Sequence, residues 1–258
     1  MAKVLMINPV VREEDVPRHV PYGLALLAAI AIQKGHLVQV YDANAWRLGE
    51  ATLRQVLRAD DWQVIALGGI TTAYGSIREI VRLARQECPH SIILLGGGVL
   101  TSLPTEMMTW LPEVDVGCVG EGFDTFAEIL AMVDAGTFNW QSIDGTISRN
   151  AEGVPVLSRQ RALLDQLDRL PYPAWDLFPL EEVYFKNSQM LYSPEGMLAK
   201  RRLDINASYG CSLICRYCFH LGIAGDMRYS VDTGGKGSVH FDEPGKHSRT
   251  IRYHSPEY

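Results

Sequence analysis

Long apolar runs are scarce in this sequence of 258 residues. The longest covers residues 23–33, whereas a helix that crosses a bilayer needs about 20 apolar residues. A basic segment followed by an apolar stretch, the pattern of a secretory signal, is also missing from the first residues. These two absences argue against a membrane span and against export, and they predict a cytoplasmic protein.

Positive charge is in deficit and is not gathered into blocks. Lysines and arginines number 24 against 30 aspartates and glutamates, which gives a formal net charge of -6. Proteins that bind nucleic acid neutralise its phosphates with clustered Lys and Arg side chains. The charge balance therefore gives no support to a nucleic-acid partner, and it favours a small-molecule or peptide substrate.

Cysteine is rare, and its distribution is uneven. Five cysteines occur in the chain, and three of them, Cys211, Cys215 and Cys218, stand close together. So few cysteines do not make a disulfide framework, whereas clustered thiols suit cofactor ligation in a reducing compartment. Cys88 and Cys118 are most simply small buried residues near the ends of a helix and a strand.

The three clustered cysteines are the strongest candidates for chemistry. They follow a C-x3-C-x2-C spacing, with Tyr217 directly before the last one. Three thiolates on one short loop can hold three irons of a 4Fe-4S cluster and leave the fourth iron open, whereas electron-transfer clusters usually take a fourth Cys. The alternatives are a zinc site with His220 as its fourth ligand, or reduced structural thiols.

The first 140 residues alternate strand and helix patterns in a regular way. Short, largely apolar runs predict five strands, at residues 3–8, 37–42, 64–69, 91–95 and 116–119. Helical patterns follow them, at residues 23–34, 51–58, 76–87, 104–111 and 124–135. Apolar strands that alternate with helices form a parallel sheet covered on both faces. We therefore expect a doubly wound, flavodoxin-like α/β domain with five parallel strands.

Glycine and small polar residues follow the predicted strands. Ligands of doubly wound sheets bind beyond the carboxyl ends of the strands, where the strand order reverses. Glycines there let the backbone approach a large flat ligand closely. The candidate contact residues are Gly69, Thr71, Thr72, Gly96, Gly97, Gly98, Gly120, Glu121 and Gly122. Glu121 has a second interpretation, because a carboxylate ahead of a helix that starts at Asp124 could cap its backbone donors.

Taken in order, these loops resemble the cobalamin-binding domain that precedes the barrel of cobalamin-dependent radical S-adenosylmethionine (radical SAM) proteins. The matching pieces are residues 21–24, 35–36, 42–44, 69–72, 96–98 and 119–122, and residues 167–178 resemble the linker of that family. The cysteine spacing and Tyr217 resemble its cluster loop. The resemblance covers nearly the whole chain up to Cys218.

The resemblance implies three cofactors. These are cobalamin above the strand ends, a 4Fe-4S cluster on the three clustered cysteines, and S-adenosylmethionine on the open iron with Tyr217 near its nucleotide. It also implies an external electron donor of the flavodoxin or ferredoxin type. The Asp-x-His-x-x-Gly run that ligates cobalt in other cobalamin domains is missing, as is common in radical SAM relatives. His19 and His36 are the only histidines of the early half that could face the strand ends.

The activity implied by the resemblance is methyl transfer to an unactivated carbon or phosphorus of a small molecule or peptide, through a 5'-deoxyadenosyl radical. An anaerobic radical cyclase of the tetrapyrrole type is one alternative. A non-catalytic cobalamin-binding protein, which would use the first domain alone, is another. A tRNA methylthiotransferase would also carry the three-Cys loop, but its first domain holds additional cluster cysteines, and the first cysteine here is Cys88.

A connecting segment is predicted at residues 141–200. It begins with a hairpin whose strands lie at residues 145–149 and 154–157, joined by a turn-forming loop. A stretch rich in proline and aromatic residues follows. We expect its aromatic side chains to pack between domains rather than to form a substrate cage.

The last segment, residues 201–258, is predicted to start a radical SAM (βα) barrel. A strand at residues 203–207 and a sharp turn at Gly210 would lead into the cysteine loop. Only about 55 residues follow Leu203, whereas a barrel needs about 200 at the size of a βαβ unit. We therefore expect a truncated barrel and no turnover by this chain alone.

Overall fold

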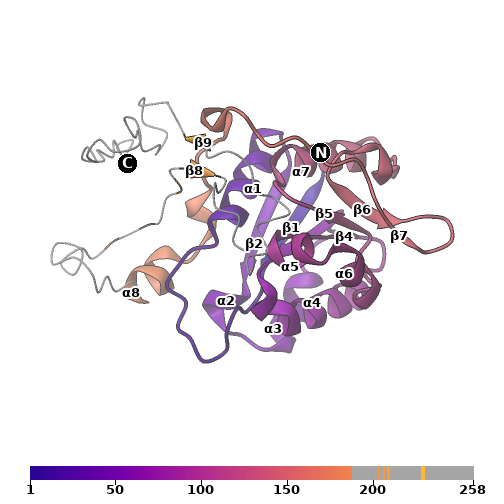
Figure 1. Cartoon of the computed structure of the whole chain (residues 1–258). Helices are drawn as coiled ribbons and strands as arrows, with labels where there is room; N and C mark the ends of the chain where they lie inside the picture. Colours follow the sequence, from indigo (N-terminus) through magenta and orange to yellow (C-terminus); the bar gives the residue numbers. More distant parts are fainter. Residues whose placement is uncertain (188–200, 202, 204–205, 207, 210–227, 230–258) are drawn as a thin grey trace.

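Seven strands form one mixed sheet in the order β2-β1-β3-β4-β5-β6-β7, and β8 pairs with β9 separately (Figure 1). The computed structural model describes residues 1–187, 201, 203, 206, 208–209 and 228–229. The strands are β1 Lys3–Asn8, β2 Leu37–Asp42, β3 Val64–Gly68, β4 Ile92–Gly96, β5 Val116–Cys118, β6 Thr146–Arg149, β7 Pro155–Leu157, β8 Ser208–Tyr209 and β9 Arg228–Tyr229. The α-helices are α1 Tyr22–Gln33, α2 Ala43–Trp46, α3 Glu50–Leu57, α4 Tyr74–Glu87, α5 Gly97–Ser102, α6 Pro104–Trp110, α7 Phe123–Asp134 and α8 Phe185–Asn187.

The five strands predicted for the first 140 residues are confirmed, and they are parallel. The predicted hairpin is also present, but it belongs to the same sheet. Strand β6 pairs antiparallel with β5, and β7 with β6, so the sheet has seven strands rather than five. Gly117 makes this close packing possible, because a Cβ there would lie 2.5 Å from Ile147 Cγ2 and 2.7 Å from Leu100 Cδ2. The sheet therefore continues past residue 140.

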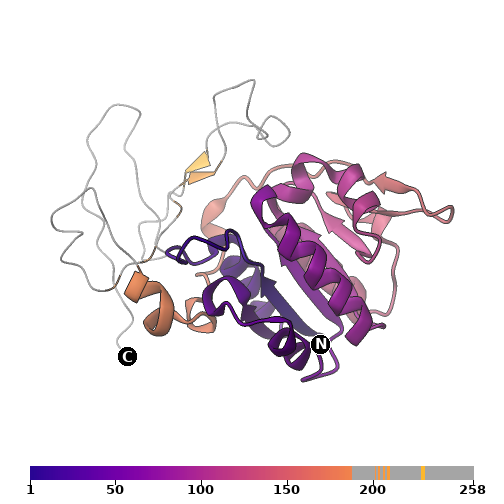
Figure 2. The same ribbon diagram turned by 90° about the horizontal axis from the view of Figure 1, so that it is seen from below.

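Helices cover both faces of the sheet, as the apolar strands predict. Val4 and Met6 pack with α1 and α7 on one face, and Leu5 and Ile7 pack with α3, α4, α5 and α6 on the other. Consecutive strand residues point to opposite faces, and burial on both is why these strands are apolar throughout. Figure 2 shows the sheet between its helices from a second side.

The connecting segment packs against the outer side of α1. Ala174 donates its backbone N–H to the carbonyl of Ala25 at 3.0 Å, and the ring of Trp175 lies 5.7 Å from that of Tyr22. The side chain of Tyr184 is only 1% exposed and lies in a cluster with Ala25 and Phe178. This segment explains why α1 is apolar all round: it has the sheet on one side and the connecting segment on the other.

The predicted strand at residues 203–207 is wrong for Leu203 and Asn206, which lie outside any strand. Strand β8 follows directly, at Ser208–Tyr209. Gly210, the three clustered cysteines, Tyr217 and His220 lie outside the described residues, so the barrel start stays a prediction. No helix of the described part is long and apolar enough to cross a membrane.

Candidate functional site

The carboxyl ends of β3 and β4 meet backbone to backbone. Gly68 pairs with Gly96 in register, and a Cβ on Gly68 would lie 2.9 Å from the Gly96 carbonyl oxygen. Gly97 has a φ of +79°, and a Cβ there would lie 2.8 Å from both the nitrogen and the oxygen of Gly69. Only glycine satisfies this backbone angle and this contact without strain. We call these four residues, Gly68, Gly69, Gly96 and Gly97, the glycine floor.

Exposed hydroxyl and apolar side chains follow the glycine floor along the chain. Thr71 and Thr72 are exposed on a 3₁₀ turn after β3, and Ile70 before them is 49% exposed. Leu103, after α5, is 44% exposed. The stretch of residues 96–98, predicted as a loop, is in fact the start of helix α5 at Gly97. The edge thus offers backbone groups, hydroxyls and apolar surface to a ligand.

The loop after β5 adjoins this edge and is tied to its neighbours. Gly120 has a φ of +82° and donates its backbone N–H to Thr101 Oγ1 at 3.1 Å. Glu121 Oε2 accepts the backbone N–H of Leu164 at 3.0 Å, a bond to the connecting segment that neither sequence interpretation predicts. Beneath Gly122, burial raises the pKa of the Cys118 thiol to about 12, so that this cysteine stays protonated and inert.

A buried carboxylate lies at the carboxyl end of β2. Asp42 is 1% exposed, and its side chain accepts hydrogen bonds from Asn8 Nδ2 at 2.7 Å, from the backbone of Ala45 at 2.9 Å, and from the hydroxyl of Tyr184. Burial raises the pKa of Asp42, and these hydrogen bonds oppose the shift. Asn8 ends β1 beside the switch point between β1 and β3, so Asp42 fixes the orientation of a polar side chain there.

Arg47 orders the loop between β1 and α1. It has a φ of 53°, and its guanidinium donates to the carbonyls of Asn44, Glu13 and Asp15 at 2.6, 3.1 and 2.8 Å. The loop runs along the same edge of the sheet, because β1 ends at Asn8. Sequence reasoning missed Arg47, since a single arginine after a strand carries no pattern of its own.

The two early histidines lie in different places. His19 is exposed on the loop between β1 and α1. His36 immediately precedes β2, at the opposite edge of the sheet, so the expectation that it could face the strand ends is wrong. Its Nδ1 accepts the backbone N–H of Ala2 at 3.2 Å, and burial lowers its pKa. A neutral ring follows, and Asp134 at 3.8 Å is then a polar neighbour rather than an ion-pair partner.

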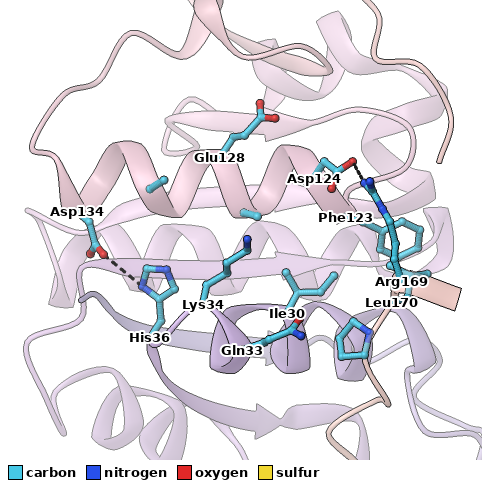
Figure 3. A pocket seen from close by; sticks show the side chains of 13 residues that line it. Ile30, Gln33, Lys34, His36, Phe123, Asp124, Glu128, Asp134, Arg169 and Leu170 are labelled. Atoms are coloured by element: carbon cyan, nitrogen blue, oxygen red, sulfur yellow. Dashed lines mark hydrogen bonds and ion pairs between the residues drawn. The ribbon is translucent and has the colours of Figure 1, made fainter. Parts of the chain in front are cut away.

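A groove of about 520 Å³ lies elsewhere, between α1, α7 and the connecting segment. Figure 3 shows Ile30 of α1, and Lys34 just after it, pointing toward α7, with the Asp124–Arg169 ion pair at one end of the groove. None of the candidate contact residues lines it. Among the residues that the structure describes, no three His, Cys, Asp or Glu side chains converge on a possible metal site.

Comparison with known proteins matches the first half of the chain to a ligand-binding family. Residues 9–130 match the family model described as B12 binding domain. An uncharacterized methyltransferase of Pyrococcus horikoshii is 25% identical over 84% of this chain and 45% of its own length. By sequence, the first half of the chain is thus similar to B12-binding domains, and most of the chain is similar to part of a larger methyltransferase.

Two further relatives extend the comparison. The anaerobic magnesium-protoporphyrin IX monomethyl ester cyclase of Synechocystis sp. is 25% identical over 88% of this chain and 44% of its own length. The radical S-adenosylmethionine methyltransferase TsrM from Kitasatospora setae, solved with cobalamin and a [4Fe-4S] cluster, superposes with a TM-score of 0.64 at 17% identity, over 89% of this chain and 43% of TsrM. The chain thus spans less than half the length of these relatives.

The residues of the B12-binding domain fit a large flat ligand. The glycine floor has no side chains to hold a macrocycle away from the backbone, and the exposed Ile70, which directly follows Gly69, offers apolar contact. Thr71, Thr72 and the nearby backbone groups can bond polar groups at a ring's periphery. The site therefore has both kinds of surface that a corrin ring with amide side chains requires.

Proposed function

We propose that this chain binds cobalamin at the carboxyl edge of its sheet and holds a 4Fe-4S cluster through Cys211, Cys215 and Cys218. The cobalamin contacts would be Gly69, Thr71, Thr72, Gly96, Gly97, Gly98, Gly120, Glu121 and Gly122. The observation that carries this proposal is the glycine floor, which lies beside the switch point within the stretch that matches the B12-binding family. The groove between α1 and α7 lies outside that edge and is not part of the proposed site.

The protein to which this chain belongs is, on this proposal, a methyltransferase. When bound, cobalamin would carry a methyl group, and the cluster would pass an electron to S-adenosylmethionine on its open iron, with Tyr217 near the nucleotide. The substrate would be a small molecule or peptide, the electron donor a flavodoxin or ferredoxin type of protein, and the location the cytoplasm. Support comes from the methyltransferase of P. horikoshii and from the fold shared with TsrM. The similarity to a cyclase at equal identity keeps a radical cyclase as the second candidate.

The chain's own residues would orient the ligand rather than react with it. Asp42 holds the Asn8 amide at the switch point, and Arg47 holds the loop that runs from there to α1. Both act through hydrogen bonds within the protein, so they form the site before a ligand arrives. Such preorganisation lowers the cost of binding.

Cofactor stoichiometry tests the proposal. After anaerobic reconstitution with iron, sulfide and hydroxocobalamin, followed by gel filtration, the chain should retain about one cobalamin and about four irons. Cobalamin without iron would instead support the non-catalytic binding protein. Iron without cobalamin would support the methylthiotransferase type. A chain that retains neither cobalamin nor iron would contradict the proposal outright.

A further inference from the structure

The strand that precedes the cysteine loop in the sequence contacts the B12-binding domain through an aromatic side chain. Tyr209, in β8, lies with its ring 5.6 Å from that of Phe123, at an interplanar angle of 86°. Edge-to-face contact of this kind is the preferred geometry of aromatic pairs. Phe123 is the first residue of α7 and directly follows the Gly120–Gly122 loop of the proposed cobalamin site.

A hydrogen-bond chain holds the same ring from its other end. The hydroxyls of Tyr209 and Tyr22 share a hydrogen bond, and Asn206 Nδ2 donates to the Tyr209 hydroxyl at 3.4 Å. The backbone of Asn206 in turn bonds the Tyr22 hydroxyl. Burial raises the pKa values of both phenols, so both remain neutral. Tyr22 opens α1 and also contacts Trp175 of the connecting segment.

These contacts join three parts of the chain at one place. Tyr22, Phe123 and Tyr209, which we call the aromatic joint, come from the starts of α1 and α7 and from β8. Both helices start at the carboxyl edge of the sheet. Cys211 is two residues beyond Tyr209 in the sequence, and two residues of extended chain span at most about 7 Å.

We propose that Tyr209 is a positioning residue whose ring, held by Tyr22 and Phe123, fixes the end of β8, two residues before Cys211 in the sequence, at the carboxyl edge of the B12-binding domain. The inference rests on the proposed function where it assigns a cluster to the three cysteines. The aromatic joint itself does not depend on that function. Its consequence is that the cluster and the cobalamin are held on one framework. Side-chain packing provides this attachment, because in the described part of the chain β8 pairs with β9 and not with a strand of the main sheet.

Amide hydrogen exchange on the 258-residue chain without cofactors tests the joint. Tyr209→Leu removes both the ring contact and the hydroxyl, so amides of residues 119–126 and of β8 should exchange about tenfold faster. Tyr209→Phe keeps the ring on Phe123 and should retain most of the protection. Tyr172→Leu, at a tyrosine that is 50% exposed on the connecting segment, is the matched control and should change neither region.

A spectroscopic readout connects the joint to the cofactors. In reconstituted wild type and Tyr209→Phe, reduction of the cluster should speed the relaxation of the Co(II) electron-spin signal, and in Tyr209→Leu this effect should weaken. Unchanged exchange at residues 119–126 in Tyr209→Leu would overturn the inference whether or not cofactors bind. Tenfold faster exchange in a chain that binds neither cofactor would instead overturn the proposed function and leave the joint standing.

Discussion

Replacing Cys211, Cys215 and Cys218 together by alanine should abolish iron binding. The reconstituted wild type should hold about four irons and show the broad visible absorption of thiolate-to-iron charge transfer, because three thiolates suffice for a cluster with one open iron. The triple variant should hold almost none and lose the absorption. Iron and acid-labile sulfide assays with the visible spectrum measure both.

Two single variants make this experiment specific. Cys88→Ala should keep the full iron content, because Cys88 lies after α4 and its thiol donates to the carbonyl of Leu57. His220→Ala should also keep it, whereas a zinc site with four ligands would need that histidine. Stoichiometric zinc without iron uptake in the wild type would contradict the cluster.

Tyr184→Phe should destabilise the chain by about 1.5–3 kcal/mol, the usual contribution of a hydrogen bond to a charged group. The hydroxyl donates to the carboxylate of Asp42, and both side chains are only 1% exposed. Denaturant unfolding at neutral pH would measure the loss.

Tyr41 provides the matched control for this prediction. This residue directly precedes Asp42 in β2, and its hydroxyl is buried and has no hydrogen-bond partner among the described residues. Tyr41→Phe should therefore leave the free energy of unfolding unchanged or raise it by up to about 1 kcal/mol, since it removes an unpaired buried polar group. Equal destabilisation by the two variants would show that the bond to Asp42 contributes little.

The effect of Tyr184→Phe should also depend on pH. Burial places the folded-state pKa of Asp42 above its ordinary value of 3.8, so the folded chain binds the extra proton more readily than the unfolded chain. Asp42 alone therefore lowers the free energy of unfolding as the pH rises from 3.8 to its pKa in the folded chain. Above that pKa, Asp42 adds no further pH dependence. The hydroxyl bond opposes that loss, because it favours the ionised form. The difference between wild type and Tyr184→Phe should thus be largest above the folded pKa and shrink as the pH falls through it.

The local pattern of the sequence was enough to predict the layers of the fold. Apolar strands alternating with helices can bury their faces only in a parallel sheet covered on both sides, and glycines after the strands mark the edge where a ligand can approach. The start of α5 at Gly97 was missed, because a glycine triplet looks like a turn when its neighbours are unknown.

What the sequence could not predict depends on contacts between distant residues. Tyr184 reaches Asp42 across 142 positions, and no local pattern marks a tyrosine as the partner of a particular carboxylate. The contact of Gly97 with the backbone of Gly69 and the pairing of β6 with β5 are of the same kind. The aromatic residues of the connecting segment predicted packing, but not which helix they would cover.

Hydroxocobalamin titration of three proteins tests the central claim, that the carboxyl edge of the sheet holds cobalamin. Thr72→Trp places a large ring on the exposed turn beside the glycine floor, and should weaken binding at least tenfold, or by about 1.4 kcal/mol. Ala131→Trp places the same ring in the groove between α1 and α7, where Ala131 is exposed, and should bind like the wild type. Full affinity in Thr72→Trp together with lost affinity in Ala131→Trp would contradict the account and place the ligand in the groove.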